Sequence, residues 1–262
     1  SLYGGLKTTN DFDDILNDAN IDGVVISTPA VTHYDLAKKA LMSGKHVFVE
    51  KPLSLKISEA EELVNLSNEK KKILMVGHIL QYHPAVIKLK ELIDCGELGK
   101  IQYIYSNRLN IGKIRTEENI LWSFAPHDIS VILMLLNELP ERIFATGGSY
   151  LQQKITDVTV TTMDFKDGVK AHIFVSWLHP FKEQKLIVVG DKKMAVFDDM
   201  SKEKLFLYSH KIDWKDRIPV ATKSAAEIVK FDSTQEPLKS ECSHFLECME
   251  KNTKPKTDGT EG

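Results

Sequence analysis

The sequence predicts an α/β protein in which a parallel sheet covered by helices precedes a second domain with a large, mainly antiparallel sheet. Three observations lead to this prediction. Short strands and helices alternate in the first part of the chain. Those strands are apolar throughout, which is typical of strands covered on both faces. Later strands alternate in polarity and are separated by turn signals, as in an antiparallel sheet with one open face.

Six elements are expected before residue 78, in the order helix, strand, helix, strand, helix, strand. Their expected ranges are 11–18, 22–27, 32–43, 46–49, 58–70 and 73–77. An amphipathic helix at 84–95 follows and ends at the turn signals Gly96 and Gly99. We therefore place a first domain at 1–99 and a second domain at 100–262.

The second domain is expected to contain several strands and two helices. The strands are expected near 101–111, 159–165, 171–177, 185–190 and 194–199. The apolar run ISVILMLL predicts a helix from His127 to Asn137, and a last helix is expected at 238–252.

Composition excludes several classes of partner. The 262 residues carry a formal net charge of −3, so nothing favours binding to nucleic acid or to an anionic membrane surface, and a small molecule is the expected partner. Three cysteines without paired spacing predict neither a disulfide framework nor a zinc site, and no clustered Cys/His run indicates any other metal. No apolar run reaches the roughly 18 residues of a membrane span, and no signal-peptide pattern is present, so the cytoplasm is the expected compartment.

Polar and glycine-containing turns follow three successive strands of the predicted parallel sheet. The strands end in Thr28-Pro29, Lys51-Pro52 and Gly77-His78. Because ligands bind at the carboxyl ends of parallel strands, these endings predict a binding site. For the first of them a second interpretation stays open: Thr32 caps the next helix and His33 is merely exposed.

Lys51 is the candidate acid in this site. Pro52 cannot continue a central strand and restricts how Lys51 leaves the sheet. A partly desolvated lysine beside Glu50 is able to donate a proton or a hydrogen bond to a substrate oxygen. The alternative is a solvated ion pair at a strand end.

His127 and Asp128 are expected at the start of the helix in the second domain. There the helix dipole disfavours an imidazolium, and a neutral histidine is able to take a proton from an alcohol. The alternative is that Asp128 caps the helix and His127 packs. Arg108, Asn110 and Arg115 are candidates for binding an anionic substrate group, although scattered surface arginines are common.

Three stretches of the chain resemble one known family. They are GVVISTPAVTHYDLAKKALMSGKHVFVEKPLSL, VGHILQYHPAVIKLKELIDCGELGKI and ENILWSFAPHDISVILMLL. The combination of TPxxxH, EKP and a downstream PHD helix is similar to the Gfo/Idh/MocA family of nicotinamide-dependent sugar oxidoreductases. The resemblance covers nearly the whole chain. It implies a partial Rossmann doubly wound parallel sheet, followed by an α+β domain whose open sheet carries the substrate site and mediates a homo-oligomer, either a dimer or a tetramer.

The residues and the resemblance together give a set of expected site residues. Cofactor-binding residues are expected at Ser27, Thr28, Pro29, His33, Glu50, Lys51, Pro52, His78 and Gln81. Substrate-binding residues are expected at Lys51, Arg108, Asn110, Arg115, Trp122, His127 and Asp128. Lys51 and His127 match the family's catalytic positions. The implied cofactor is NAD, with NADP left open because the residue that reads the ribose 2′ position would precede this sequence.

The chain departs from the family pattern in two ways. Many members carry an aspartate four residues before the catalytic histidine, where this chain has Ser123, so Lys51 and His127 are left to suffice, with Asp128 as support. The family's GxGxxG turn would precede Ser1, and the final DG-x-EG resembles the lead-in to a further helix. We therefore expect a fragment of a longer protein, and little dinucleotide binding by this segment alone.

Within the family, the segments around Arg108, His127 and His179 are most similar to a branch that oxidises carbon 3 of nucleotide-linked N-acetylated sugars or hexuronic acids. In that branch Arg108 and Arg115 would contact a diphosphate or sugar carboxylate. Two alternatives stay open. One is a lyase or glycosidase that uses NAD transiently, and the other is a non-catalytic sensor of sugar nucleotides or NAD(P).

Overall fold

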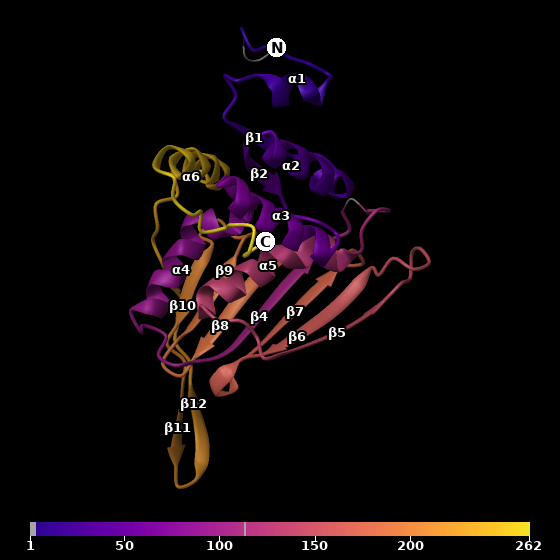
Figure 1. The fold of residues 1–262 in the computed structure, drawn as a ribbon. Helices are drawn as coiled ribbons and strands as arrows, with labels where there is room; N and C mark the ends of the chain where they lie inside the picture. Colours follow the sequence, from indigo (N-terminus) through magenta and orange to yellow (C-terminus); the bar gives the residue numbers. More distant parts are fainter. Residues whose placement is uncertain (1–3, 113) are drawn as a thin grey trace. The chain divides into compact units, whose positions relative to one another are not determined.

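The computed structural model describes residues 4–112 and 114–262, and they form two compact units (Figure 1). The first unit runs to His78 and takes in Glu241–Gly262, and the second is Ile79–Ser240. The expected boundary at residue 99 differs from this division. The helix after residue 83 packs its apolar side into the core of the second unit, and the last helix returns to the first unit, where Phe245 lies 5.6 Å from Phe48 between ring centroids.

The first unit contains the predicted parallel sheet, in the order β1 (Gly23–Ile26), β2 (His46–Glu50), β3 (Leu74–Gly77). Both strand pairs are parallel. Its helices are α1 (Phe12–Asn17), η1 (Ala30–Thr32), α2 (His33–Met42), α3 (Ile57–Lys70) and most of α6 (Pro237–Lys251). Apolar side chains of α2 and α3 pack on those of the strands, and Ala40, Leu41, Leu63, Val47 and Val49 are fully buried.

The segment after α6 pairs with the edge of β3. The Val76 N–H donates to the Thr257 carbonyl at 2.8 Å, and the Gly259 N–H donates to the Leu74 carbonyl at 3.1 Å. A Cβ on Gly259 would lie 2.6 Å from the Leu74 side chain, so the close approach requires glycine. Thus β3 has a partner on both sides, and its carboxyl end, with Gly77 and His78, is held in place.

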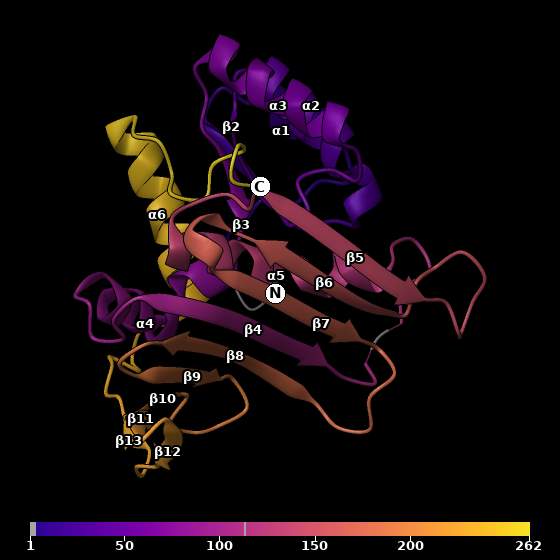
Figure 2. The same cartoon turned by 90° about the horizontal axis from the view of Figure 1, so that it is seen from below.

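The second unit is built on an eight-stranded sheet in the order β13-β10-β9-β8-β4-β7-β6-β5 (Figure 2). The strands are β4 (Ile101–Leu109), β5 (Arg142–Gly148), β6 (Val158–Asp164), β7 (Lys170–Ser176), β8 (Glu183–Gly190), β9 (Met194–Asp198), β10 (Leu205–Tyr208) and β13 (Glu227–Ile228). Strands β4 and β7 run parallel, and the other neighbouring pairs are antiparallel. The prediction of a large, mainly antiparallel sheet is confirmed.

Further elements of this unit lie outside the large sheet. They are η2 (Ile79–Tyr82), α4 (Pro84–Asp94), α5 (Ile120–Leu136), η3 (Lys166–Gly168) and the hairpin β11 (Lys211–Lys215) with β12 (Ile218–Thr222). The hairpin forms a separate two-stranded sheet that projects from the end of the large sheet (Figure 1).

One face of the large sheet is covered by helices and forms the core of the second unit. Helix α5 packs on β4, β6 and β7, and α4 packs on α5 and β9. The strand residues under them are fully buried, for example Ile104, Ile173 and Val188. The alternate residues, such as Tyr105 and Ile187, face the opposite side and are half-buried, which is the alternation expected of such a sheet.

Helix α5 begins at Ile120, seven residues before the predicted start. The Asn119 side chain caps it by accepting a hydrogen bond from the Trp122 N–H at 3.1 Å. Pro126 lies inside the helix. His127 therefore lies about two turns from the helix start, beyond the reach of the helix dipole, and the argument that the dipole keeps its imidazole neutral was wrong.

Among the described helices, none combines the length and the apolar character that crossing a membrane requires.

Candidate active site

The loops after β1 and β2 are joined by a buried histidine. His33 Nδ1 lies 2.7 Å from the Pro52 carbonyl oxygen, and His33 Nε2 lies 2.8 Å from the Thr28 carbonyl oxygen. The side chain is 1% exposed, so the interpretation of an exposed His33 was wrong. Because both ring nitrogens are used by backbone carbonyls, the structure gives His33 the task of holding the two loops together.

The first of these loops presents exposed polar groups. Ser27, Thr28 and Pro29 are exposed at the end of β1. The Thr32 hydroxyl donates to the Pro29 carbonyl at 2.8 Å and lies 2.6 Å from the Thr28 hydroxyl. Because Thr32 has only one hydroxyl proton, the Thr28 hydroxyl is the donor of this second bond. Thr32 makes no side-chain bond to the amides of α2, so its hydroxyl orders this loop and does not cap the helix.

The second loop places Glu50 and Lys51 at the end of a fully buried strand. Both residues are half-buried, Pro52 is buried, and the Lys51–Pro52 peptide is cis. A Cβ on Gly77 would lie 3.0 Å from Glu50 Oε2, so the glycine of the neighbouring strand leaves room for the carboxylate. The strand ending is therefore shaped around Glu50.

His78 completes this edge of the sheet. Burial, together with the smaller effect of the positive charge of Lys51, lowers the pKa of His78 to about 4, so the ring is neutral at pH 7. It is 4% exposed, and neither ring nitrogen has a hydrogen-bond partner among the described residues. A neutral imidazole buried in this way is the kind of group that a bound ligand satisfies.

Glu241, a further titratable residue whose pKa is affected by Glu50, was not singled out from the sequence. This residue of α6 is fully buried, and neither carboxylate oxygen has a hydrogen-bond partner within the described part of the chain. The pKa of Glu241 is raised to about 8, mainly by burial and also by the charge of Glu50, against the opposing effect of Lys256. The signal that was available is spacing, because Glu241 shares the buried face of α6 with Phe245 and Cys248.

We expect Glu241→Gln to make the protein more stable near neutral pH and to flatten the dependence of its stability on pH. The folded chain keeps the Glu241 proton up to about pH 8, whereas the unfolded chain releases it near 4.5, so stability falls as the pH rises through this interval. Since one pKa unit corresponds to about 1.4 kcal/mol, the advantage of the variant over wild type should grow by about 3 kcal/mol between about pH 5 and about pH 7.5.

Denaturant unfolding at several pH values measures this difference. Glu247→Gln is the matched control, because Glu247 lies on the exposed side of the same helix in an ion pair with Lys251. Parallel pH profiles for wild type and Glu241→Gln would contradict the expectation.

In the second unit, Arg108 and Asp128 form a buried ion pair. Arg108 Nε donates to Asp128 Oδ2 at 2.7 Å, and Arg108 Nη2 donates to Asp128 Oδ1 at 3.2 Å. The residues are 7% and 3% exposed. This placement differs from the expected substrate contact, because the guanidinium is already taken by Asp128 and is sequestered from solvent.

Of the other predicted residues of this unit apart from His127, two are exposed and two are half-buried or buried. Arg115 and Trp122 are exposed and accessible, and Arg115 Nε lies 3.8 Å from Glu118 Oε1. Asn110 is half-buried, and its N–H extends the pairing of β4 with β7 by donating to the Ser176 carbonyl at 3.1 Å. Gln81 is 2% exposed and donates to the Ser130 carbonyl at 3.4 Å, so it is attached to α5.

His127 is half-buried on α5, and Ser123 lies one turn before it and is buried. The His127 carbonyl accepts a hydrogen bond from the Ser130 hydroxyl at 3.2 Å. Lys51 belongs to the first unit and His127 to the second.

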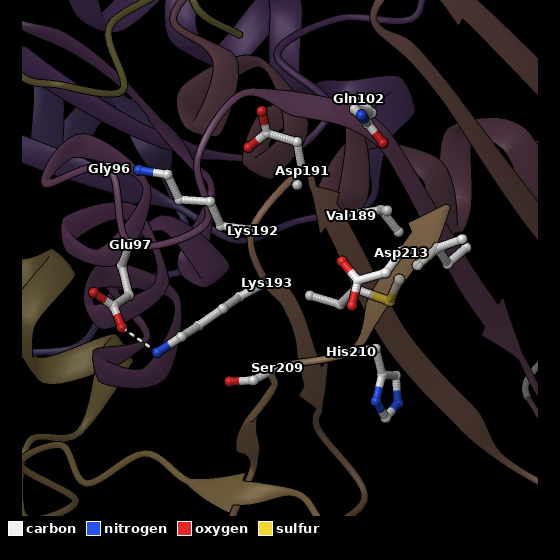
Figure 3. A pocket seen from close by; sticks show the side chains of 13 residues that line it. Gly96, Glu97, Gln102, Val189, Asp191, Lys192, Lys193, Ser209, His210 and Asp213 are labelled. Atoms are coloured by element: carbon white, nitrogen blue, oxygen red, sulfur yellow. Dashed lines mark hydrogen bonds and ion pairs between the residues drawn. The ribbon is translucent and has the colours of Figure 1, made fainter. Parts of the chain in front are cut away.

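A large open cavity lies elsewhere in the second unit, with a volume of about 880 Å³ (Figure 3). It lies beside the β8–β9 turn and the base of the β11–β12 hairpin, and none of the predicted site residues lines it. Lys193 and Glu97 form an ion pair there, and Lys192, Asp191 and Asp213 complete a lining of mixed sign. Within the described residues, no group of three His, Cys, Asp or Glu side chains is arranged to hold a metal.

A parallel sheet with polar loops at the carboxyl ends of its strands is the class of fold that nucleotide-binding α/β proteins use. Residues 3–78 match the model of the Gfo/Idh/MocA oxidoreductase family, NAD-binding Rossmann fold, and residues 86–196 match that of its C-terminal domain. Together these matches cover most of the chain. The chain belongs to the Gfo/Idh/MocA family and is an NAD-using oxidoreductase.

The individual relatives share about a quarter of their residues with this chain. UDP-N-acetylglucosamine 3-dehydrogenase of Acidithiobacillus ferrooxidans is 26% identical over 245 residues, which are 93% of this chain and 75% of that protein. Its solved structure gives a TM-score of 0.81 at 23% identity, over 97% of this chain and 78% of that one, which shows the fold. Inositol 2-dehydrogenase of Salmonella typhimurium is 27% identical over 80% of this chain and 66% of that protein.

Proposed function

We propose that the protein transfers a hydride between NAD and a hydroxyl-bearing carbon of a sugar, specifically carbon 3 of a UDP-N-acetylated hexose or hexuronic acid. The observation that carries the proposal is the end of β2. There Lys51 follows a buried strand and lies half-buried beside Glu50, and its positive charge acts on the buried, neutral His78. The similarity to a UDP-N-acetylglucosamine 3-dehydrogenase over most of both chains supports the choice of substrate.

Residues of the first unit suit the cofactor. Ser27, Thr28 and Pro29 offer exposed groups on a loop that His33 holds to the Lys51 loop, and these groups would line the ribose and pyrophosphate. His78 supplies a buried ring nitrogen that a ligand would satisfy. When bound, NAD supplies the carbon that accepts or returns hydride.

The chain's own residues handle the substrate oxygen and its proton. Lys51 hydrogen-bonds the oxygen and polarises it, and a ring nitrogen of His127 takes the proton as the carbonyl forms. Ser123 stands where many relatives carry an aspartate, so we assign the proton transfer to His127 without a carboxylate at that position. The exposed Arg115 is the remaining arginine candidate for the diphosphate.

Absorbance of the reduced nicotinamide tests the proposal when the protein is mixed with NAD and UDP-N-acetylglucosamine or its uronic acid. Accumulation of NADH that depends on the sugar nucleotide is the expected result. Exchange of ring protons with solvent and no net NADH would instead identify a lyase or glycosidase. Binding of the sugar nucleotide with neither signal would identify a sensor.

We further propose a homo-oligomer, a dimer or tetramer, formed through the open face of the large sheet, and the cytoplasm as its compartment. That face carries half-buried aromatic and aliphatic side chains, including Tyr105, Phe174, Ile187 and Val196, and Tyr105 stacks on His172 at 5.3 Å between ring centroids. Aromatic and aliphatic side chains gathered on an open sheet face, with polar residues among them, are typical of subunit interfaces.

We expect Ile187→Glu to convert the oligomer to a monomer, because a carboxylate in the middle of this face would lose its hydration on association. Light scattering coupled to size-exclusion chromatography measures the mass. Ile57→Glu is the matched control, since Ile57 is 75% exposed at the start of α3. A wild-type monomer, or an Ile187→Glu protein of unchanged mass, would exclude this interface.

A further inference from the structure

The turn of α5 that carries His127 is attached to the sheet beneath it by polar bonds. Asp128, the residue after His127, accepts two bonds from Arg108 and a third from the Ser106 hydroxyl at 2.7 Å, and both donor residues lie on β4. Ser106 is fully buried. The Asp128 carboxylate is therefore engaged by three donors, all from one strand.

The network continues on the far side of Arg108. With its amide oriented to suit its neighbours, Gln184 on β8 accepts from Arg108 Nη1 at 3.2 Å and donates to Asp199 Oδ2 at 3.1 Å. The guanidinium is thus fixed at three of its nitrogens, between a residue of α5 and a residue of β8. A planar guanidinium held in this way has one orientation, and it imposes that orientation on the carboxylate it binds.

This part of α5 has a specific need for such an attachment. Pro126 has no N–H, so the Trp122 carbonyl one turn earlier lacks its usual donor in the helix, and the helix is weakened immediately before His127. Apolar packing holds α5 against the sheet but fixes its rotation and its position along its axis less sharply than directed bonds do, because hydrophobic attraction is not directional. The bonds to Asp128 supply that direction.

We propose that Arg108 and Asp128 are positioning residues for His127, which fix the rotation and height of the α5 turn from which the imidazole projects. Successive residues point about 100° apart around a helix, so Asp128 directed at the sheet sets where His127 points. In this proposal Asp128 acts through the backbone of α5. The inference rests on the proposed function of His127 in proton transfer.

Arg108→Lys tests the proposal, because lysine keeps the positive charge but cannot make the bidentate hydrogen bonds of a guanidinium to Asp128. We expect kcat to fall by about tenfold to a hundredfold, as for a misplacement of about 1 Å, with the KM for NAD unchanged within about twofold. In a His127→Asn background the same substitution should lower the residual rate by less than about twofold, because the residue it positions is gone. Equal losses in both backgrounds, or no loss in either, would overturn the proposal.

Two further variants serve as a control for Arg108→Lys and as its replacement if it does not fold. Arg142→Lys is the matched control, because Arg142 Nη2 binds Asp164 Oδ2 at 3.0 Å as an exposed pair of the same sheet, and no loss of kcat is expected. If Arg108→Lys does not fold, Ser106→Ala replaces it, since this change removes one neutral donor and leaves the ion pair. We expect it to lower kcat by about threefold to tenfold with His127 present and not with His127→Asn.

An activity-independent measurement separates this inference from the proposed function. If no sugar substrate is turned over by wild type, the proposed function fails, and the imidazole resonances of His127 in the full chain then report on positioning. Arg108→Lys should shift or broaden these resonances, and Arg142→Lys should leave them unchanged. Resonances that are unaffected by Arg108→Lys would overturn the positioning role whatever the reaction.

Discussion

Lys51→Ala in the full-length protein is expected to lower kcat by about a thousandfold or more and to leave the affinity for NAD within about threefold, because the lysine acts chiefly on the substrate oxygen. Steady-state absorbance of NADH gives kcat, and calorimetric titration with NAD gives the affinity. Lys56→Ala is the control, since the Lys56 side chain is 72% exposed in an ion pair with Glu59 on the same connecting segment.

The same variant carries an internal check on its structure. The charge of Lys51 contributes to lowering the pKa of His78, after the larger contribution of burial, so removing that charge should raise the pKa of His78. A proton NMR titration of His78 detects this change. If that pKa rises while turnover is unchanged, Lys51 is present beside His78 but has no part in the chemistry.

Much of the fold could be predicted because local pattern and global structure agree in this chain. The apolar runs that became β1, β2 and β3 are short and continuous, and helix-forming segments separate them, which leaves a parallel sheet as the simple solution. The start of α5 could not be predicted in the same way. Pro126 reads as a helix breaker in the sequence, and the cap that overrides it is a single side chain, Asn119.

The site shows where sequence reasoning stops. The types of residue at the strand ends were visible, but the partner of each residue was not, because it lies far away in the chain. His33 binds a carbonyl 19 residues later, and Asp128 binds an arginine 20 residues earlier. Spacing within one element carries no information about such pairs, so the structural contacts of His33 and Arg108 could not be predicted from the sequence.

Asp128→Ala is expected to lower the free energy of unfolding by about 3–5 kcal/mol, because it leaves the Arg108 charge buried without a partner. In wild type the Asp128 carboxylate raises the pKa of Arg108 against the opposing effect of burial. Without Asp128 the guanidinium still keeps its proton, because arginine is not deprotonated in proteins, so its charge stays buried without its ion-pair partner. Denaturant unfolding measures the change. Asp164→Ala, at a half-buried carboxylate whose partners Arg142 and Lys170 are both exposed, should cost only about 1 kcal/mol.

Replacing both partners should separate stability from catalysis. Arg108→Met combined with Asp128→Leu removes both charges and fills similar space, so we expect the free energy of unfolding to return to within about 1 kcal/mol of wild type. Turnover should stay low, because an apolar pair packs without directing the rotation of α5. A double variant as unstable as Asp128→Ala would show that the uncompensated charge is not the cause, and one with full turnover would show that His127 needs no polar attachment.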